Sequence, residues 1–478
     1  MTRKATSLSG PSTSPPTRQA QQLSQGASNT PSALPAYFVG LEIENIRSFG
    51  TKQVLDLSLG GLPARWTVIL GDNGVGKTTL LQSLAEFQSV GEVFHDEAEG
   101  ENLLRHAWFP RAYNTGYFLE ARRYGTRESS RSLAGVQISL GGTLQHVSTQ
   151  RTVEALSFVI GPDPHGNINT TGSFQNLDRL ICYGYGATRR MGAVALSEQE
   201  PDDSTVSLFS DDVSLLNAEE WLLQSDYNAL VDSPVREQAR ARRDQLIEVL
   251  INLLPEVSDI RFVRPTEIGR RPRVEVEVPY GWVNISDLSL GYRALVAWIV
   301  DFAYRMFERY QGSENPLAEP AIVLVDEIDL HLHPKWQRSL ISYLTERFPN
   351  TQFIVTAHSP LIVQAATDAN IVLLRREGDH VVIDNDVEAI RGWRIDQVLT
   401  SDLFGLETAR PPEYDELLAQ RAKLLGKAKL TKRDESRLKK LESEIGDLPA
   451  GESVADIEAM DVIRQAAEVL KREGTTGR

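Results

Sequence analysis

The chain has 478 residues, of which 41% are hydrophobic and 24% are charged, and its formal net charge is −15. This composition is that of a globular protein with a large core, and the acidic balance argues against a strongly basic nucleic-acid coat. The single cysteine, Cys182, excludes an internal disulfide and suits a reducing compartment. No stretch approaches the roughly 20 apolar residues of a membrane helix, so we expect a cytoplasmic protein without membrane contact.

The N-terminal residues 1–36 are rich in Ser, Thr, Pro and Gln and contain no acidic residue. Such a segment has too few large apolar side chains to order itself, which predicts a disordered tail. A transit peptide shares this composition and is the alternative. From Tyr37 onward, alternating apolar residues around a turn at Gly50-Thr51 predict a β-hairpin.

The next apolar run, residues 66–70, predicts a buried strand, and the spacing of Leu80, Leu81, Leu84 and Phe87 predicts a helix. The segment between them matches the pattern G-x-x-x-x-G-K-[ST] at every fixed position. Its glycines allow backbone N–H groups to surround a phosphate, while Lys77 reaches the β and γ oxygens and Thr78 ligates Mg²⁺. The residues of this predicted triphosphate site are Gly71, Asp72, Asn73, Gly74, Val75, Gly76, Lys77, Thr78 and Thr79.

The hairpin before this loop leaves two interpretations open. Arg47 and Phe49 lie on this hairpin, where they either contact the nucleotide or are a surface arginine and a packed aromatic.

Residues 100–178 contain short apolar segments punctuated by Gly and Ser, which predict a small antiparallel lobe. A buried strand then leads into Gly184-Tyr185-Gly186-Ala187-Thr188-Arg189-Arg190, whose arginines either face phosphate or lie on a solvated turn.

Residues 196–258 are first acidic and then helical, with helices predicted over 218–223 and 236–254 before Pro255. A predicted strand over 273–278 leads to Asp287-Leu288-Ser289-Leu290-Gly291-Tyr292-Arg293 and an apolar helix over 294–307. At this helix start, Ser289 and Gly291 form either a second anion site or a plain N-cap.

The five apolar residues Ala321–Val325 predict a strand buried on both faces, with Asp326 and Glu327 at its C-terminal end. Open α/β sheets place their ligands at this end. We therefore predict that Asp326 holds Mg²⁺, directly or through water, and that Glu327 polarises the attacking water. Pro334 is expected to open the following helix.

The next predicted strand, 353–356, ends before His358. A histidine beside the carboxylates can hydrogen-bond a γ-phosphate, although a lone histidine is more often structural. His331 and His333 suggest a metal site, but no cysteine or further histidine cluster joins them.

The C-terminal part is predicted to be helical and highly charged after a hairpin over 371–374 and 381–383. Two antiparallel helices are expected over 416–429 and 431–445, with a capping box of Thr431 and Asp434 and a third helix from Ser453. Their apolar stripe is either local core or a surface for a partner.

The ordered set of phosphate loop, Leu-Ser-x-Gly, strand-Asp-Glu and strand-His resembles the ABC-type ATPases of the SMC/RecF/OLD group. The residue sequences of four segments are similar to those of stand-alone bacterial ATPases described as "predicted ATP-binding proteins involved in virulence". These segments are residues 184–187, 287–293, 326–334 and 353–360. The ATPase subunits of Septu, retron and PARIS antiphage systems are relatives of that family. The resemblance covers roughly residues 37 to 400.

This resemblance implies a role for each motif. Lys77 and Thr78 belong to the Walker A loop, and Asp326 and Glu327 form Walker B with the catalytic base. Two departures from the family pattern concern nucleotide binding. Leu290 stands where Gly or a polar residue is common, and no Gln is assigned to the Q-loop. The remaining implied roles are the signature for Ser289 and Gly291, the D-loop for Asp329, and the switch histidine for His358.

The implied fold is an α/β ABC-type P-loop NTPase head, a mixed sheet with an antiparallel lobe. Its two parts are residues 37–195 and 259–400, separated by an inserted helical subdomain, 196–258, and followed by a helical tail, 401–478, as a candidate docking element. Because a signature loop cannot reach its own nucleotide in this group, the resemblance implies two heads that sandwich ATP, in a homodimer or a higher even oligomer.

The implied function is an ATPase with ATP and Mg²⁺ as cofactors that controls an effector, a nuclease or toxin from a neighbouring gene, in antiphage defence. The alternative is a RecF- or SMC-like repair ATPase that clamps duplex DNA. A Toprim nuclease domain like that of the OLD group is not recognised after His358. We therefore expect no intrinsic nuclease.

Overall fold

The computed structural model describes residues 35–96, 103–110, 132–140, 143–151, 156–161, 180–193, 203–264, 271–387, 392–406, 411–425, 427 and 431–445. The chain divides into two compact units, residues 1–391 and 392–478. None of the helices in the described stretches is long and apolar enough to cross a membrane. The expected tail over 1–36 lies almost wholly outside the described residues, as does the expected third helix from Ser453.

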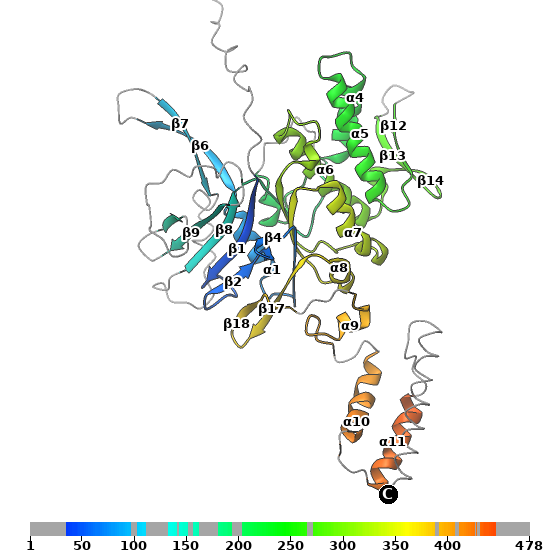
Figure 1. Cartoon of the computed structure of the whole chain (residues 1–478). Coiled ribbons are helices and arrows are strands. Elements are labelled where there is room, and N and C mark those ends of the chain that lie inside the picture. Colours follow the sequence, from blue (N-terminus) through cyan, green and yellow to red (C-terminus); the bar gives the residue numbers. More distant parts are fainter. Residues whose placement is uncertain are drawn as a thin grey trace, which may run out of the picture. The chain divides into compact units, whose positions relative to one another are not determined.

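A six-stranded sheet forms the centre of the first unit, in the order β11-β15-β16-β5-β17-β18. Its strands β17 and β18 are labelled in Figure 1. The first five strands run parallel, and β18 pairs antiparallel with β17. Every residue of β15 and β16 is buried, as expected for strands covered on both faces. The strands are β11 (Cys182–Tyr185), β15 (Ala321–Val325), β16 (Thr351–Thr356), β5 (Trp66–Gly71), β17 (Asn370–Glu377) and β18 (His380–Asp384).

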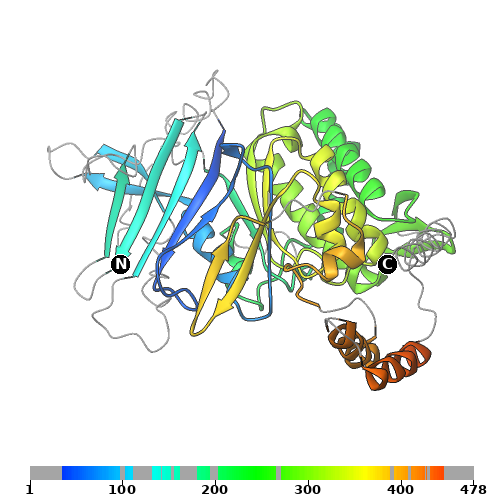
Figure 2. The same cartoon turned by 60° about the horizontal axis from the view of Figure 1, so that its bottom comes forward.

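A second, antiparallel sheet has the order β10-β9-β8-β1-β2 and confirms the predicted hairpin and lobe. Figure 2 shows its strands, coloured blue to cyan, on the other side of the unit from the helices coloured green to yellow. Its strands are β1 (Ala36–Glu44), β2 (Gln53–Asp56), β8 (Ser132–Leu140), β9 (Thr143–Arg151) and β10 (Leu156–Gly161). Two short ladders accompany it, β3 (Ser58–Leu59) with β4 (Leu62–Pro63) and β6 (Ser89–Asp96) with β7 (Leu103–Pro110).

Helix α1 (Lys77–Ala85) lies in one core between the two sheets. This core combines Leu41 of β1, Leu81 of α1 and Ile354 of β16, all fully buried. The predicted apolar spacing after the phosphate loop is confirmed, because Leu80, Leu81, Leu84 and Phe87 are all buried. The phosphate-binding loop therefore leads into a helix that packs against both sheets.

The opposite face of the central sheet is covered by an aromatic layer. Phe302 of α6 (Leu290–Arg309) contacts Tyr183 of β11 edge-on, with ring centroids 5.4 Å apart. The ring of Trp66 stacks on Phe353 at 4.3 Å, so β5 and β16 belong to the same layer. Two further helices, α7 (Pro334–Arg347) and α8 (Pro360–Ala365), follow β15 and β16 respectively, and α7 begins at the predicted proline.

Between β11 and α6 the chain forms a helical pair and a small sheet. Helix α4 (Ala218–Leu230) is capped by Asn217, whose side chain accepts from the Glu220 N–H, and continues seven residues beyond the predicted end. Helix α5 (Arg236–Leu253) matches its prediction to within one residue. The remaining elements are the sheet of β12 (Asp259–Val263), β13 (Arg273–Val278) and β14 (Gly281–Asn284), and the short helices η3 (Val206–Leu208), η4 (Ile285–Asp287) and η5 (Pro316–Ala318).

In the second unit, the predicted capping box is confirmed: the Asp434 N–H donates to Thr431 Oγ1 at 3.2 Å, and the Thr431 N–H donates to Asp434 Oδ2 at 3.0 Å. The hydrogen bond from Lys427, together with the bonds from Thr431, lowers the pKa of Asp434 to about 2. The helices of this unit are α9 (Ile395–Leu399), η6 (Pro412–Tyr414), α10 (Asp415–Leu425) and α11 (Lys432–Ile445).

Candidate functional site

The phosphate-binding loop connects the end of β5 to the start of α1, as its sequence predicts. Three of its glycines have positive φ: 142° at Gly71, 79° at Gly74 and 100° at Gly76. A residue with a side chain rarely adopts these angles. A Cβ on Gly76 would also collide with Ser48 Oγ, and it would lie 3.0 Å from the Phe49 ring. The loop therefore needs glycine at this position for its conformation and for its packing.

Lys77 lies over this loop and is largely buried, with 6% of its surface exposed. Its Nζ donates to the carbonyl oxygens of Gly71 at 2.8 Å and Asp72 at 2.9 Å. Burial lowers the pKa of Lys77, and the nearby carboxylates of Asp326 and Glu327 oppose that shift. The ammonium is thus held at the loop by two carbonyl oxygens, and its positive charge is suited to bind phosphate oxygens there.

The carboxylate of Asp326 lies at the C-terminal end of β15 and connects three segments. Its Oδ2 accepts from Thr78 Oγ1 and its Oδ1 accepts from Thr356 Oγ1, each at 2.6 Å. Thr78 begins α1 and Thr356 ends β16, so the parallel pairing of β15 with β16 brings these oxygens together. The two predicted metal ligands, Thr78 and Asp326, are therefore in direct contact.

This donor set fits Mg²⁺, because the hydroxyl of Thr78 and the carboxylate of Asp326 offer the hard oxygens that this ion prefers. Among the described residues there is no cluster of three or more His, Cys, Asp and Glu side chains that could enclose a metal. Water and phosphate oxygens would complete the shell, which is the usual arrangement for Mg²⁺ with a nucleotide.

Glu327 follows Asp326 with a positive φ of 48°. Its N–H donates to Thr356 Oγ1 at 2.7 Å. Arg189 reaches the same segment: Nη1 donates to the Asp326 carbonyl at 3.0 Å and Nη2 to the Glu327 carbonyl at 2.7 Å. Burial lowers the pKa of Arg189 to about 10, so the guanidinium keeps its charge at neutral pH. Of the two arginines after β11, Arg189 is buried and Arg190 is exposed, so only Arg190 occupies a solvated turn.

His358 lies directly after β16 and is tied to Asp329. Its backbone N–H faces the carboxylate of Asp329, at 3.1 Å from Oδ2 and 3.3 Å from Oδ1. Its Nε2 is buried and has no hydrogen-bond partner among the residues that the structure describes. A buried ring nitrogen without a hydrogen-bond partner costs free energy, so Nε2 is a candidate to bind a ligand atom.

The predicted signature residues lie at the N-terminus of α6, which starts four residues before the predicted helix. Ser289 is exposed and its side chain makes no capping hydrogen bond, and Leu290 is 52% exposed. Gly291 is buried, and a Cβ there would collide with the carbonyl oxygen of His331. The signature helix is thus packed against the segment that follows Asp329, while its first residues remain accessible.

The sequence of this chain matches models of known protein families. A family model described as "AAA domain, putative AbiEii toxin, Type IV TA system" matches residues 200–364, and an "AAA domain" model matches residues 40–85. The two matched segments carry the carboxylates and the phosphate loop that meet in this site. Over these two segments the chain is similar to proteins with an AAA domain.

Relatives of this chain have names from antiphage systems, as the sequence resemblance indicates. "Septu protein PtuA" of Bacillus mycoides (strain KBAB4) is 27% identical over 419 residues, which are 85% of this chain and 50% of the relative. "Retron Ec83 probable ATPase" of Escherichia coli is 31% identical over 247 residues, 51% of this chain and 42% of the relative. The chain thus spans about half the length, or less, of these relatives.

Among solved structures, the fold is similar to that of an SMC head bound to the C-winged helix domain of ScpA. The TM-score is 0.42 and the identity is 16%, over 73% of this chain and 97% of that chain.

Arg47 lies beside α1, while its predicted companion Phe49 lies in the core. Arg47 Nη1 donates to Gln82 Oε1 at 2.8 Å and approaches Thr79 Oγ1 at 3.4 Å. Phe49 is fully buried in the core, so for this residue the packed-aromatic alternative is the right one. His333 Nδ1 accepts from the Lys335 N–H at 3.3 Å and thereby caps α7.

Two residues of the site were not recognised in the sequence. Thr356 contacts both Asp326 and Glu327, and its only sequence signal is a hydroxyl at the end of a buried strand. Gln337 accepts from Ser359 Oγ at 2.6 Å, and its amide contacts the Asp329 carbonyl at 3.3 Å. Gln337 thus connects the segment after His358 to Asp329, a link that no local pattern in α7 indicates.

Proposed function

We propose that this chain binds ATP with Mg²⁺ and hydrolyses it. Lys77 and the loop amides would hold the phosphates, Thr78 and Asp326 would hold Mg²⁺, and Glu327 would polarise the attacking water. Bound Mg²⁺ would neutralise phosphate charge as it develops. The observation that carries this proposal is the 2.6 Å contact of Thr78 with Asp326, which joins the Walker A and Walker B segments into one site.

Two variants separate binding from hydrolysis. Lys77→Ala should abolish binding of a fluorescent ATP analogue, because it removes the buried cation that would face the phosphates. Glu327→Gln should retain binding but lose phosphate release, on the order of 10²-fold or more, because an amide cannot act as the base. Lys335→Ala, an exposed lysine of α7, is the matched control for the first variant. Full phosphate release by Lys77→Ala would refute the proposal.

The same proposal includes an ATP-bound dimer. Ser289 and Leu290 are exposed at the N-terminus of α6, so they are accessible to the nucleotide of a second copy. Helix N-termini attract anions, and α6 is 20 residues long. Each composite site would then contain Lys77, Asp326, Glu327 and His358 of one head and Ser289 of the other. ATP would favour the dimer through its higher affinity for the closed state.

Dimerisation is tested by measuring the mass of Glu327→Gln in solution with and without ATP. A doubled mass with ATP is expected, and adding Ser289→Arg should abolish it because the bulky side chain blocks the helix N-terminus. Ser342→Arg on the exposed side of α7 is the control and should leave the dimer intact. A Glu327→Gln protein that remains a monomer with saturating ATP would exclude the sandwich.

We further propose that the ATP cycle controls an effector in antiphage defence, in the cytoplasm. The names of the Septu and retron relatives support this role. The tail over 401–478 is the proposed docking element. Its helices α10 and α11 contact each other through Gln420 and Arg437, and Lys427 between them donates to Asp434. Capture of the tagged chain from native cells, with and without this tail, should recover the product of a neighbouring gene only with the tail. Recovery of duplex DNA and repair proteins alone would favour the DNA-clamp alternative.

A further inference from the structure

The guanidinium of Arg189 holds the two peptide groups on either side of Glu327. Its Nη1 donates to the Asp326 carbonyl and its Nη2 to the Glu327 carbonyl, at 3.0 and 2.7 Å. The peptide groups are planar, so the direction of the Glu327 side chain depends only on the two backbone torsions between them and on its own rotamer. A rigid, planar group that binds both carbonyls therefore restricts both backbone torsions.

Glu327 needs such a restraint because its φ of 48° lies in the left-handed region. A residue with a side chain persists in this region only where its surroundings hold it there. The Glu327 N–H is held by Thr356 Oγ1, and its carbonyl oxygen is held by Arg189 and also by the Leu330 N–H at 3.0 Å. Of these groups, only Arg189 contacts the carbonyl on each side.

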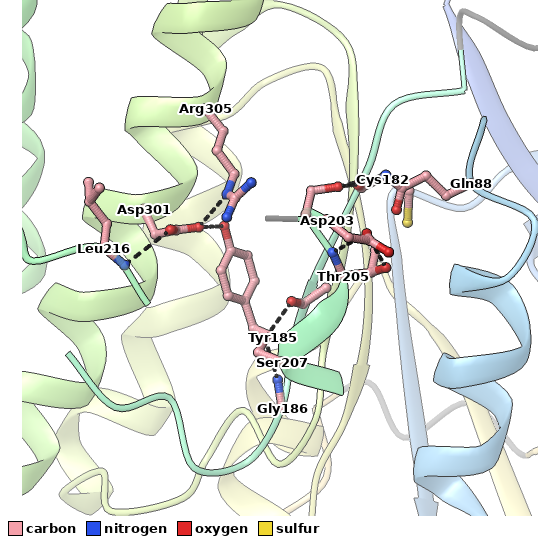
Figure 3. Close-up of polar contacts among 12 residues, drawn as sticks. Gln88, Cys182, Tyr185, Gly186, Asp203, Thr205, Ser207, Leu216, Asp301 and Arg305 are labelled. Atoms are coloured by element: carbon pink, nitrogen blue, oxygen red, sulfur yellow. Dashed lines mark hydrogen bonds and ion pairs between the residues drawn. The ribbon is translucent and has the colours of Figure 1, made fainter. Parts of the chain in front are cut away.

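Arg189 is itself fixed from the strand that precedes it. Tyr185 pairs with Val325 in the parallel ladder, and the Tyr185 carbonyl accepts from the Asp326 N–H at 2.8 Å. The Tyr185 hydroxyl donates to Asp301 of α6 at 2.9 Å, and the following Gly186 lies against Ser207 (Figure 3). The chain leaving β11 therefore starts from a rigid position, and Arg189 is 3% exposed at its end.

We propose that Arg189 is a positioning residue that aims the carboxylate of Glu327, a role that rests on the proposed function of Glu327 as the base. Arginine suits this task better than lysine, because a planar fork can donate to two acceptors at once and a single ammonium presents no such plane. Among the described residues, the hydrogen bonds of Arg189 go to the backbone carbonyls of Asp326 and Glu327, so we expect it to act on the reaction through the position of Glu327.

The test compares Arg189→Lys, which keeps the charge, with Arg189→Ala and with Arg190→Lys as the exposed control. In both Arg189 variants the maximal rate of phosphate release should fall on the order of 10²-fold, the usual effect of a misplacement of about 1 Å. The dissociation constant for ATP should stay within about twofold, because no group that would touch the phosphates is removed. In the Glu327→Gln background, Arg189→Lys should cause no further loss. Guanidinium ions added to Arg189→Ala should restore part of the rate.

Hydrogen exchange provides a readout that does not depend on activity. In Arg189→Lys the peptide covering 322–330 should exchange faster than in the wild type, and in Arg190→Lys it should not. Unchanged exchange, or a wild-type rate in Arg189→Lys, would overturn the positioning role. Faster exchange in a protein that never hydrolyses ATP would instead support the restraint on Glu327 and refute the proposed hydrolysis, so the two failures are distinguishable.

Discussion

At the scale of single residues, two glycines of the phosphate loop differ in the constraints that exclude a side chain at their positions. Gly76 has a φ of 100° and faces Ser48 Oγ and the Phe49 ring at the position of a Cβ. Gly74 has a φ of 79°, but a Cβ there would meet nothing within 4 Å. Gly76 is therefore restricted by conformation and by packing, while Gly74 is restricted by conformation alone.

This difference predicts unequal effects of alanine. Gly76→Ala should lower the free energy of unfolding by about 1–3 kcal/mol and weaken ATP binding, because the loop must move away from Ser48 and Phe49. Gly74→Ala, with strain but no collision, should be less destabilised in the same thermal unfolding experiment. A Gly76→Ala protein as stable as Gly74→Ala would contradict the packing argument.

At the scale of elements, a buried polar cluster joins β11 to α6. Asp301 is 2% exposed and accepts from the Tyr185 hydroxyl at 2.9 Å, from Arg305 Nε at 2.7 Å and from the Leu216 N–H at 3.3 Å (Figure 3). Burial, followed by the charge of Asp301, raises the pKa of Tyr185 well above its ordinary value, so the phenol remains a donor. The helix that carries Ser289 is thereby connected to the strand that leads to Arg189.

Removing the carboxylate of Asp301 should destabilise the first unit. Asp301→Ala takes away the acceptor of Tyr185 and the partner of Arg305 in a buried setting, which costs roughly 3 kcal/mol. Thermal unfolding measures this loss, and Glu308→Ala, an exposed acid on the same helix, is the control. Equal unfolding temperatures for the two variants would show that the cluster contributes no stability.

At the scale of the whole molecule, the proposed sandwich predicts complementation between two inactive proteins. Lys77→Ala lacks a phosphate-binding lysine and Ser289→Arg lacks a usable signature, so neither protein alone can form a complete site. In a mixed dimer, one site combines the intact loop of Ser289→Arg with the intact signature of Lys77→Ala. Mixing the two proteins should therefore restore phosphate release, up to about half the wild-type rate for each mixed dimer. Activity that stays at the level of the separate proteins would mean that the sites are not shared.

Local patterns were sufficient for elements whose determinants are contiguous. The phosphate loop, the buried strand before Asp326 and the capping box of Thr431 and Asp434 each depend on residues within about one turn or one strand. The same holds for the antiparallel lobe as a class of structure, although its strand order could not be predicted, because pairing depends on segments far apart in the chain. The apolar pattern predicted α6 from residue 294, four residues after its observed start, although Ser289 was recognised as a candidate N-cap.

The sequence by itself determined that this chain has a phosphate loop, a pair of carboxylates after a buried strand and a histidine after the next one, because each signal is short and physically specific. Only the tertiary structure decided which of these residues contact one another. Arg189 and Asp326 are 137 residues apart and Thr78 and Asp326 are 248 apart, and their contacts exist because β11, β15, β16 and β5 lie in parallel and end at the same edge of the sheet. The order and direction of the strands, set by burial of their faces, therefore assemble the site from its separate parts.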